Sequence, residues 1–351
     1  MTTSVLEVVR AGPFVTVQDG GRPGMMRFGV PRSGPMDPFA HAAANTVLGR
    51  PVGSTAVEVS LGGLTVRCAD APITIAVCGG GFRVSHNGDD CNSWTSCTLQ
   101  PGDTLAITAG GWGSWCYVAV AGALQARQWL GSSSTHVRSG LGGGAVATGD
   151  RLTVIDAQVD DARTGPIDTP ASTRPTDVLR VVPGPQLQCF RPGALETLLG
   201  SPYTLSTAYD RMGVRLDGPA LELDGSLAIP SSPIVRGSLQ VAGDGVPTLL
   251  FADHQTTGGY PKIATVIAPD AASAAQLRSG QVVRFAAVTP EQAVAAARSA
   301  AADSTSQLAQ VAARPGLRTR HLLSTNLVDG AFHPDETDPD ETHPDEAHPH
   351  E

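Results

Sequence analysis

The segment Leu6-Glu-Val-Val-Arg-Ala-Gly-Pro13 has a close echo in the second half of the chain, Leu179-Arg-Val-Val-Pro-Gly-Pro185. Each copy reads as a short apolar strand that ends in a turn of glycine and proline. Two more pairs recur in the same order: Val57-Glu-Val59 before residues 71–77 with Leu221-Glu-Leu223 before residues 246–251, and residues 99–105 with residues 277–283. Three echoes in register predict a duplicated or pseudo-symmetric all-β unit.

Strand-like runs recur at short spacing in both halves, and the chain contains 40 glycines and 27 prolines. Short strands between such turn-forming residues are typical of barrels and sandwiches. The runs are residues 73–77, 104–108, 116–120, 179–182, 248–251 and 282–285. We therefore expect a mainly β protein of the α+β type, with two β-barrel lobes and few helices.

Three helices are predicted from signals at their ends. Asp37 is placed to cap a helix that begins at Pro38 and ends before Gly49. A short helix is expected over residues 192–199, again followed by a glycine. The third runs over residues 290–313, with Thr289 and Gln292 at the spacing of a capping box.

These patterns divide the chain into five parts. They are a first barrel lobe (residues 1–155), a linker or surface excursion (156–177), a second barrel lobe (178–288), a C-terminal helix (289–320) and an acidic tail (321–351). The last 19 residues repeat units such as His-Pro-Asp-Glu and hold eight carboxylates but no Lys or Arg. Repeated proline and dense like charge predict that the tail is disordered.

Charge and composition exclude several classes of protein. The net charge of −9 comes almost entirely from the tail, because residues 1–332 carry 24 basic and 25 acidic side chains. A nearly neutral body with scattered arginines indicates no nucleic-acid partner. No apolar run is long enough to cross a membrane, and the N-terminus lacks the features of a signal peptide. The six cysteines form no C-x-x-C pair, which favours reduced thiols in a cytoplasmic protein without a metal site.

Lys262 is the single lysine of the chain, and the other 23 basic residues are arginines. It ends the segment Gln255-Thr-Thr-Gly-Gly-Tyr-Pro-Lys262, in which amide and hydroxyl side chains surround two glycines. An ammonium is a compact charge whose pKa shifts readily, whereas a guanidinium stays charged and planar. The segment therefore indicates a backbone shaped around a small polar ligand, although mutational bias also explains one lone lysine.

A loop rich in glycine and proline, residues 18–37, holds further polar residues in set positions. Asp19 and Arg22 either serve a site or form a buried ion pair that braces the turn. Asp37 is either a site residue or only a helix cap. The serines of residues 131–136 indicate turn chemistry more than a nucleophile.

The segment Tyr209-Asp-Arg-Met-Gly213 has two interpretations of equal weight. Arg211 either forks onto a carboxylate or phosphate, or locks its own loop through Asp210. The nearby segment Pro183-Gly-Pro-Gln186 belongs to the same group of polar loops.

Several motifs are absent from the sequence. There is no phosphate-binding G-x-x-x-x-G-K-[ST] and no H-E-x-x-H. Lys262 is not flanked by methionines, so the chain carries no covalent biotin. A Ser-Ser-Lys amidase triad is excluded because the serine loop contains no lysine.

Together these motifs resemble the carboxyltransferase C/D-type domain family, also called the allophanate hydrolase subunit 2 family and typified by the C-type subunit of 5-oxoprolinase. The resemblance runs from Leu6 to Phe285. The matching motifs are Gln18-Asp19…Gly21-Arg22…Gly24, Gly29-Val-Pro-x-Ser-Gly-x-Met-Asp37, Pro183-Gly-Pro-Gln186, Asp210-Arg-Met-Gly213 and Gln255-Thr-Thr-Gly-Gly-Tyr-Pro-Lys262. The chain departs from the family at Tyr209 and Val214, where relatives carry Ser and Tyr, and at His254, where Arg is frequent.

The resemblance implies a cyclophilin-like β-barrel architecture and a complex with a B-type subunit of related fold and an A-type subunit. The implied reaction is hydrolysis of 5-oxo-L-proline to L-glutamate with consumption of ATP, which acts with magnesium. Lys262, Asp19 and Arg211 are then the expected catalytic residues: Lys262 would bind a phosphate or carboxylate, Asp19 would position water, and Arg211 or Arg22 would supply a second cation. The expected substrate-binding residues are Arg22, Ser33, Gln186, Gln255, Thr256, Thr257, Gly258, Gly259 and Tyr260.

Two other functions stay open at this point, because the family also contains them. One is the carboxyltransferase domain of a biotin-dependent urea or amide carboxylase. The other is a regulatory protein without turnover that binds a kinase inhibitor similar to the B-type subunit. Fold alone does not separate these possibilities.

Overall fold

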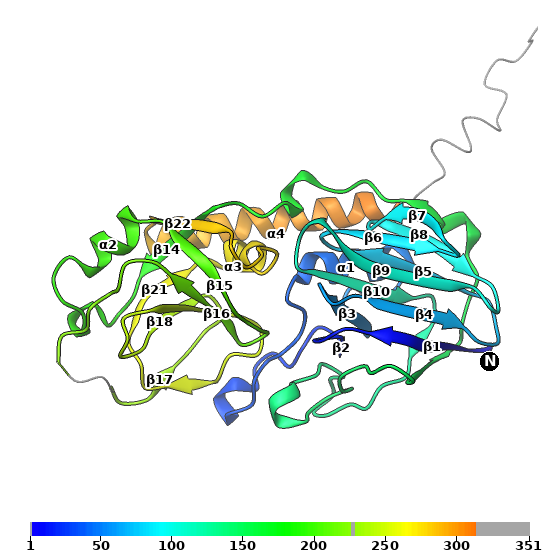
Figure 1. The fold of residues 1–351 in the computed structure, drawn as a ribbon, viewed down its shortest axis with the longest axis horizontal. Helices are drawn as coiled ribbons and strands as arrows, with labels where there is room; N and C mark the ends of the chain where they lie inside the picture. Colours follow the sequence, from blue (N-terminus) through cyan, green and yellow to red (C-terminus); the bar gives the residue numbers. More distant parts are fainter. Residues whose placement is uncertain (1, 226–228, 314–351) are drawn as a thin grey trace, which may run out of the picture. The chain divides into compact units, whose positions relative to one another are not determined.

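The first half of the chain folds as two antiparallel sheets with a shared core (Figure 1). One has the strand order β11-β12-β1-β4-β9-β6-β7: Ala123–Leu124, Arg151–Ile155, Thr3–Ala11, Leu64–Cys68, Thr104–Trp112, Gly81–His86 and Asp89–Asn92. The other has the order β13-β8-β5-β10-β3-β2: Gly165–Pro166, Thr95–Leu99, Ile73–Cys78, Trp115–Val120, Ala56–Ser60 and Thr16–Gln18. This computed structural model describes residues 2–225 and 229–313.

Alternating apolar residues fill the space between these sheets. On β1, Leu6 and Val8 are buried while Glu7 between them is not, as expected for a strand with one solvated face. They share a core cluster with Ile75 and Val118 of the other sheet. The expected barrel is therefore not what forms here: both sheets stay open as a sandwich, because each ends in short strands that have a single neighbour.

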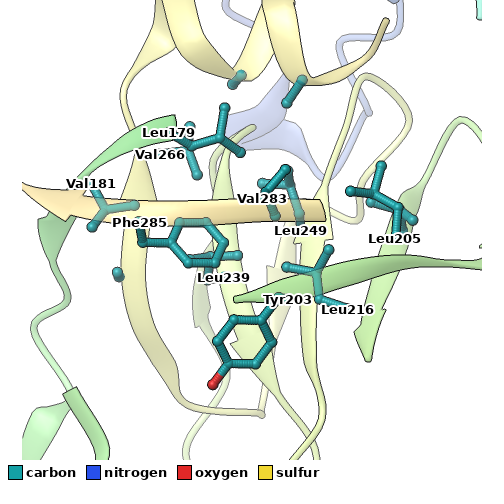
Figure 2. Close-up of a cluster of buried hydrophobic side chains, with 14 of the residues drawn as sticks. Leu179, Val181, Tyr203, Leu205, Leu216, Leu239, Leu249, Val266, Val283 and Phe285 are labelled. Carbon is teal, nitrogen blue, oxygen red and sulfur yellow. The ribbon is translucent and has the colours of Figure 1, made fainter. Parts of the chain in front are cut away.

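The second half contains a closed barrel of seven strands, in the order β14-β21-β18-β19-β16-β15-β22. Their bounds are Val178–Pro183, Lys262–Val266, Ser238–Val241, Pro247–Leu250, Gly213–Asp217, Tyr203–Tyr209 and Val282–Ala287. The first and last strands, β14 and β22, close the ring by parallel pairing. Figure 2 shows the interior, where Leu179, Leu239 and Phe285 belong to one apolar cluster. The two segments that echo each other in sequence form β1 and β14, the first strand of each half.

Two segments that lie between barrel strands along the chain form a separate two-stranded sheet. This sheet contains part of the polar segment 255–262. It pairs β17 (Ser232–Pro233) with β20 (Thr257–Gly258). This pairing brings Ser232 opposite Gly258. Short 3-10 turns occupy the loops, at Met26–Phe28, Val137–Ser139, Asp161–Arg163, Ala171–Thr173 and Leu187–Cys189.

The structure contains the three expected helices and one more: α1 (Pro38–Val47), α2 (Ala194–Gly200), α3 (Ala268–Ala274) and α4 (Pro290–Ala312). The Asp37 side chain accepts a hydrogen bond from the Ala40 amide (3.0 Å), which confirms its role as a cap. Both hydrogen bonds of the Thr289–Gln292 capping box are present. The sequence analysis missed α3, which is only seven residues long and begins without a side-chain cap.

Helix α4 packs against elements of both halves. It contacts α1 of the first half and β14 and α3 of the second, and Figure 1 shows it in orange beside them. Near its end, Val311 is buried in a cluster with Ala40 and Ala43 of α1. The predicted acidic tail and the expected end of the helix beyond residue 313 lie outside the described residues.

Three further expectations concern the cysteines, the linker and the absence of a membrane-spanning helix. All six cysteines are free thiols. Residues 156–177, expected to be a linker, contribute β13 to the edge of a sheet and bury Ile167 beside Trp94. None of the described helices is long and apolar enough to span a bilayer.

We predict that Thr289→Ala destabilises the first turn of α4 by about 1 kcal/mol, because an N-cap hydroxyl is lost. Native-state hydrogen exchange of the first-turn amides should therefore become faster. Thr305→Ala, an exposed substitution within the same helix, is the control and should not speed exchange, since alanine favours helix. Equal exchange in the Thr289→Ala variant and the original chain would contradict the capping role.

Candidate functional site

Lys262 begins strand β21, and its side chain is buried. Its Nζ donates to Ser232 Oγ (2.6 Å), and Gln186 Nε2 donates to the same oxygen (3.3 Å). The Lys262 amide in turn donates to Gln186 Oε1 (2.9 Å). Burial lowers the pKa of Lys262, and none of the described carboxylates forms an ion pair with it. The result is a cation without a counter-charge, held by neutral groups, which suits an anionic ligand.

The segment before Lys262 surrounds this group. Gly258 lies opposite Ser232, and a Cβ added at Gly258 would lie 2.5 Å from Ile234 Cδ1, so a larger residue would require the Ile234 side chain to move. The Thr256 carbonyl accepts from the Ile234 amide (3.1 Å), and the Gly259 carbonyl accepts from the Ile229 amide (2.9 Å). These bonds fix the backbone that carries the predicted polar side chains.

Gln255 and Tyr260 face a different space. Gln255 Nε2 donates to Gln240 Oε1 (3.1 Å), and Gln240 Nε2 donates to the Tyr260 carbonyl (3.3 Å). These three residues line a surface pocket of about 540 Å³ together with Asp210, and Lys262 is not part of its lining. The predicted residues of this segment are thus divided between the Lys262 group and this pocket.

Asp19 is bound by the serine loop, residues 131–136. Its carboxylate accepts from Ser132 Oγ (2.6 Å), the Ser133 amide (2.7 Å) and Ser134 Oγ (2.6 Å). Burial on its own would raise the pKa of Asp19, but the hydrogen bonds from Ser132 and Ser134 outweigh it and hold the pKa below its usual value. The loop therefore stabilises an ionised carboxylate whose oxygens already have partners.

Arg22 binds the same loop through backbone carbonyls. Its Nε donates to the Trp129 carbonyl (3.0 Å), and its Nη2 donates to the carbonyls of Ser132 and Ser134. Its guanidinium carbon also lies 5.6 Å from the centre of the Trp129 ring. Asp19 and Arg22 form no ion pair with each other among the described residues. The interpretation as an ion pair is therefore wrong, although both residues do brace the loop.

Arg211 lies between two buried carboxylates from different halves of the chain. It forks onto Asp253 through Nε and Nη2, both at 2.9 Å, and Nη1 donates to Glu58. Nη2 also donates to the Gly34 carbonyl (2.8 Å). All three side chains are at most 5% exposed. Although burial would lower the pKa of Arg211, the carboxylates of Asp253 and Glu58 outweigh it and raise the pKa.

The structure thus separates the two interpretations of Arg211. Arg211 binds a carboxylate through two nitrogen atoms, and that carboxylate belongs to Asp253 of the protein itself. Asp210 does not bind Arg211 but accepts a hydrogen bond from the Met212 amide (2.7 Å) within the turn. Glu58 Oε2 extends the network by accepting from the Met36 amide and from the Tyr117 hydroxyl, both at 2.8 Å. Arg211 is accordingly engaged on every side by the fold itself.

A second pocket, of about 470 Å³, receives residues from both halves. Ser33 and His41 come from the first half, and Arg236 and His254 from the second. Burial lowers the pKa of His41 to about 4 and also lowers the pKa of His254, so both imidazoles are neutral near pH 7. Of the residues predicted from the sequence, this pocket contains Ser33.

The sequence analysis did not select four residues of these groups: Ser232, His41, Arg236 and His254. His254 carried a signal, because it stands where relatives have arginine. His41 lies in an alanine-rich helix and Arg236 lies in a segment without a motif, so the sequence carries no signal for either residue. Ser232 becomes a neighbour of Lys262 only through the pairing of β17 with β20.

Comparison with known proteins assigns the fold to a family. The carboxyltransferase domain, subdomain A and B, matches residues 28–287, so the chain belongs to this family. The family is the expected carboxyltransferase family, but the matching subdomains are A and B and not the C/D type. It is similar to the C-type subunit of 5-oxoprolinase from Haemophilus influenzae, with 32% identity over 292 residues that cover 82% of this chain and 93% of the relative. It is also similar to the C-type subunit of 5-oxoprolinase from Escherichia coli, with 33% identity over 297 residues, or 83% of this chain and 94% of that one.

A solved structure extends the comparison. The Kluyveromyces lactis urea amidolyase superimposes with a TM-score of 0.77 at 25% identity. The match covers 86% of this chain and 20% of that much longer one. The present chain is therefore related to one segment of the urea amidolyase and to nearly the whole length of the 5-oxoprolinase subunits.

We predict that Arg211→Met lowers the free energy of unfolding by about 3–5 kcal/mol, because it leaves Glu58 and Asp253 buried without a partner. Denaturant-induced unfolding measures the change. Arg215→Met is the matched control, since Arg215 pairs with Asp244 on the surface and should contribute less than about 1 kcal/mol. Equal losses in both variants would show that the buried network is not the stronger interaction.

Stability should also depend on pH through His41. Its pKa is depressed from 6.5 to about 4 in the folded chain, so the unfolded chain binds a proton first as the pH falls. As the pH falls from 6.5 to about 4, the free energy of unfolding therefore decreases because of His41, by up to about 1.4 kcal/mol per pH unit. His41→Leu should reduce the slope of unfolding free energy against pH in this window. An unchanged slope in a folded variant would contradict the assignment.

Proposed function

We propose that this chain is the C-type subunit of an ATP-dependent 5-oxoprolinase, which hydrolyses 5-oxo-L-proline to L-glutamate in complex with a B-type subunit and an A-type subunit. The observation that carries the proposal is the match along 93–94% of the length of two relatives of that name. A chain that matches nearly the whole length of those relatives is better explained as a subunit of the same kind than as a segment of a larger enzyme.

The Lys262 group supports the proposal chemically. An unactivated lactam is hard to open, and phosphorylation of its oxygen creates a good leaving group, which accounts for the use of ATP with magnesium. Such a reaction needs cations placed where phosphoryl charge develops. Lys262 meets this need because its buried ammonium has a serine hydroxyl as partner and no ion pair with a described carboxylate. We assign to it a phosphate oxygen or the substrate carboxylate.

The other residues fall into two roles in this proposal. Gln186, Ser232 and Thr257 lie at or beside the Lys262 group and would orient the amide or the anion. Gln255, Thr256, Gly258, Gly259 and Tyr260 would shape the surrounding backbone and rim. Asp19, Arg22 and Arg211 are assigned to positioning, because the Asp19 carboxylate, Arg22 Nε and Nη2, and the Arg211 guanidinium are engaged by the protein.

A second function has a specific observation in its favour. The superposition on the urea amidolyase supports a carboxyltransferase domain that acts with a separately encoded biotin carrier. The two functions differ in their requirements: the carboxyltransferase would depend on biotin, and the 5-oxoprolinase on 5-oxoproline and ATP.

The deciding assay measures ATP-dependent glutamate release from 5-oxo-L-proline by the full chain, its B-type partner and the A-type subunit. We predict activity that disappears when this chain is omitted and that falls by about 100-fold or more in the Lys262→Met complex, because a positioned cation is lost. The Arg151→Met complex, which changes an exposed arginine of the first sheet that lines none of these groups, should keep its activity.

The contrary outcomes are equally specific. Normal turnover by a folded Lys262→Met complex would remove Lys262 from the site. No glutamate release from an intact complex, together with biotin-dependent carboxylation of urea, would replace the proposed function by the second one.

A further inference from the structure

The 470 Å³ pocket between the two halves carries positive charge and no carboxylate in its lining. Arg236 and Arg32 are its charged residues, and the acidic residues nearest in the chain are occupied elsewhere. Asp253 binds Arg211, and Asp37 caps α1. The pocket is therefore biased toward an anion.

Arg236 is a cation whose charge is not balanced by an ion pair among the described residues. Its two Nη atoms donate to the carbonyls of Pro35 and Met36, which joins the halves of the chain. Its Nε is buried and has no hydrogen-bond partner in the described residues. A role in joining the halves accounts for the Nη atoms but leaves one buried donor, Nε, without a partner among the described residues.

Two more buried polar atoms belong to residues of this wall. Ser33 Oγ and His41 Nε2 have no partner within the part of the chain that the structure describes, and their side chains are 6% and 2% exposed. Ser33 also adopts a left-handed backbone with φ of 52°, which is costly for a residue other than glycine. Unsatisfied groups and strain at one pocket are the features expected where a ligand completes the structure.

The rest of the wall is apolar. Met26, Pro35, Val52 and Ala252 line the space beside the polar groups. Inorganic anions gain nothing from such a surface, whereas the carbon skeleton of an organic acid buries apolar area against it.

We propose that this pocket binds a small organic carboxylate, with its carboxylate at Arg236 and its carbon skeleton against Met26 and Val52. Ser33 and His41 provide hydrogen bonds to a second polar group of the ligand. The site is separate from the Lys262 group, whose residues do not line this pocket.

Three probes of similar size test the proposal by calorimetric titration of the full chain. 5-Oxo-L-proline has a carboxylate and a lactam, cyclopentanecarboxylate has the carboxylate alone, and pyrrolidin-2-one has the lactam alone. The choice of 5-oxo-L-proline as a probe rests on the proposed function, whereas the site itself does not. We expect at least one of the carboxylates to bind and pyrrolidin-2-one to bind much more weakly.

Variants locate the binding. Arg236→Gln should weaken carboxylate binding about tenfold or more, because a charged hydrogen bond is lost. Ser33→Gly should weaken the binding of 5-oxo-L-proline more than that of cyclopentanecarboxylate, and glycine suits its left-handed backbone, so this variant keeps the fold. Arg151→Gln, an exposed arginine of the first sheet, is the control and should leave binding unchanged.

The proposal is overturned if the folded chain binds neither carboxylate, if pyrrolidin-2-one binds as well as they do, or if the Arg236→Gln and Ser33→Gly variants both bind like the original chain. Binding of cyclopentanecarboxylate without 5-oxo-L-proline would support the pocket and remove 5-oxoproline as its ligand. Binding of both carboxylates by a complex that releases no glutamate would support the pocket and contradict the proposed function.

Discussion

One buried guanidinium joins the two halves of the chain and sets the positions of the groups around it. Arg211 comes from the turn between β15 and β16 of the barrel, and it binds Glu58 on β3 of the sandwich and Asp253 after β19. A buried charge is costly unless every polar atom around it is paired. This requirement fixes neighbours as well as partners: Glu58 also binds Tyr117 and the Met36 amide, and Arg211 binds the Gly34 carbonyl. These hydrogen bonds therefore hold the polar loop before α1 against the barrel. The pocket lined by Ser33 and Arg236 lies between this loop and the second half.

Much of the fold follows from local signals in the sequence. The caps at Asp37 and Thr289 predict where α1 and α4 begin, because a side-chain acceptor at that position satisfies amides that the helix leaves free. The short strands and the turns between them are equally visible. Whether a sheet closes into a barrel cannot be read from these local signals, because closure depends on pairing between strands that are distant in the sequence. The parallel contact of β14 with β22 closes the second half, and among the described residues no such contact joins the edge strands of the first.

The candidate site, like the fold, is predicted only in part by local signals in the sequence. The composition around Lys262 predicts a polar group there, and the structure places Gln186 beside it through a hydrogen bond to the Lys262 amide. Asp19 and Arg22 looked similar in sequence, but their partners are the serines and carbonyls of a loop more than 100 residues away. Ser232 and Arg236 lie in a segment without a motif, and they gain their meaning only from β17 pairing and from the carbonyls of Pro35 and Met36. Long-range contacts of this kind leave no periodic trace in a single sequence.

The position of α4 has a consequence for how the chain acquires its structure during synthesis. The strands of the sandwich and helix α1 leave the ribosome first, but the apolar surface of α1 that receives Val311 is covered by a helix made more than 240 residues later. Until residues 290–312 emerge, that surface of the first half stays open to solvent and to other nascent chains. A chain truncated before residue 290 would therefore lack the helix that covers this surface of α1.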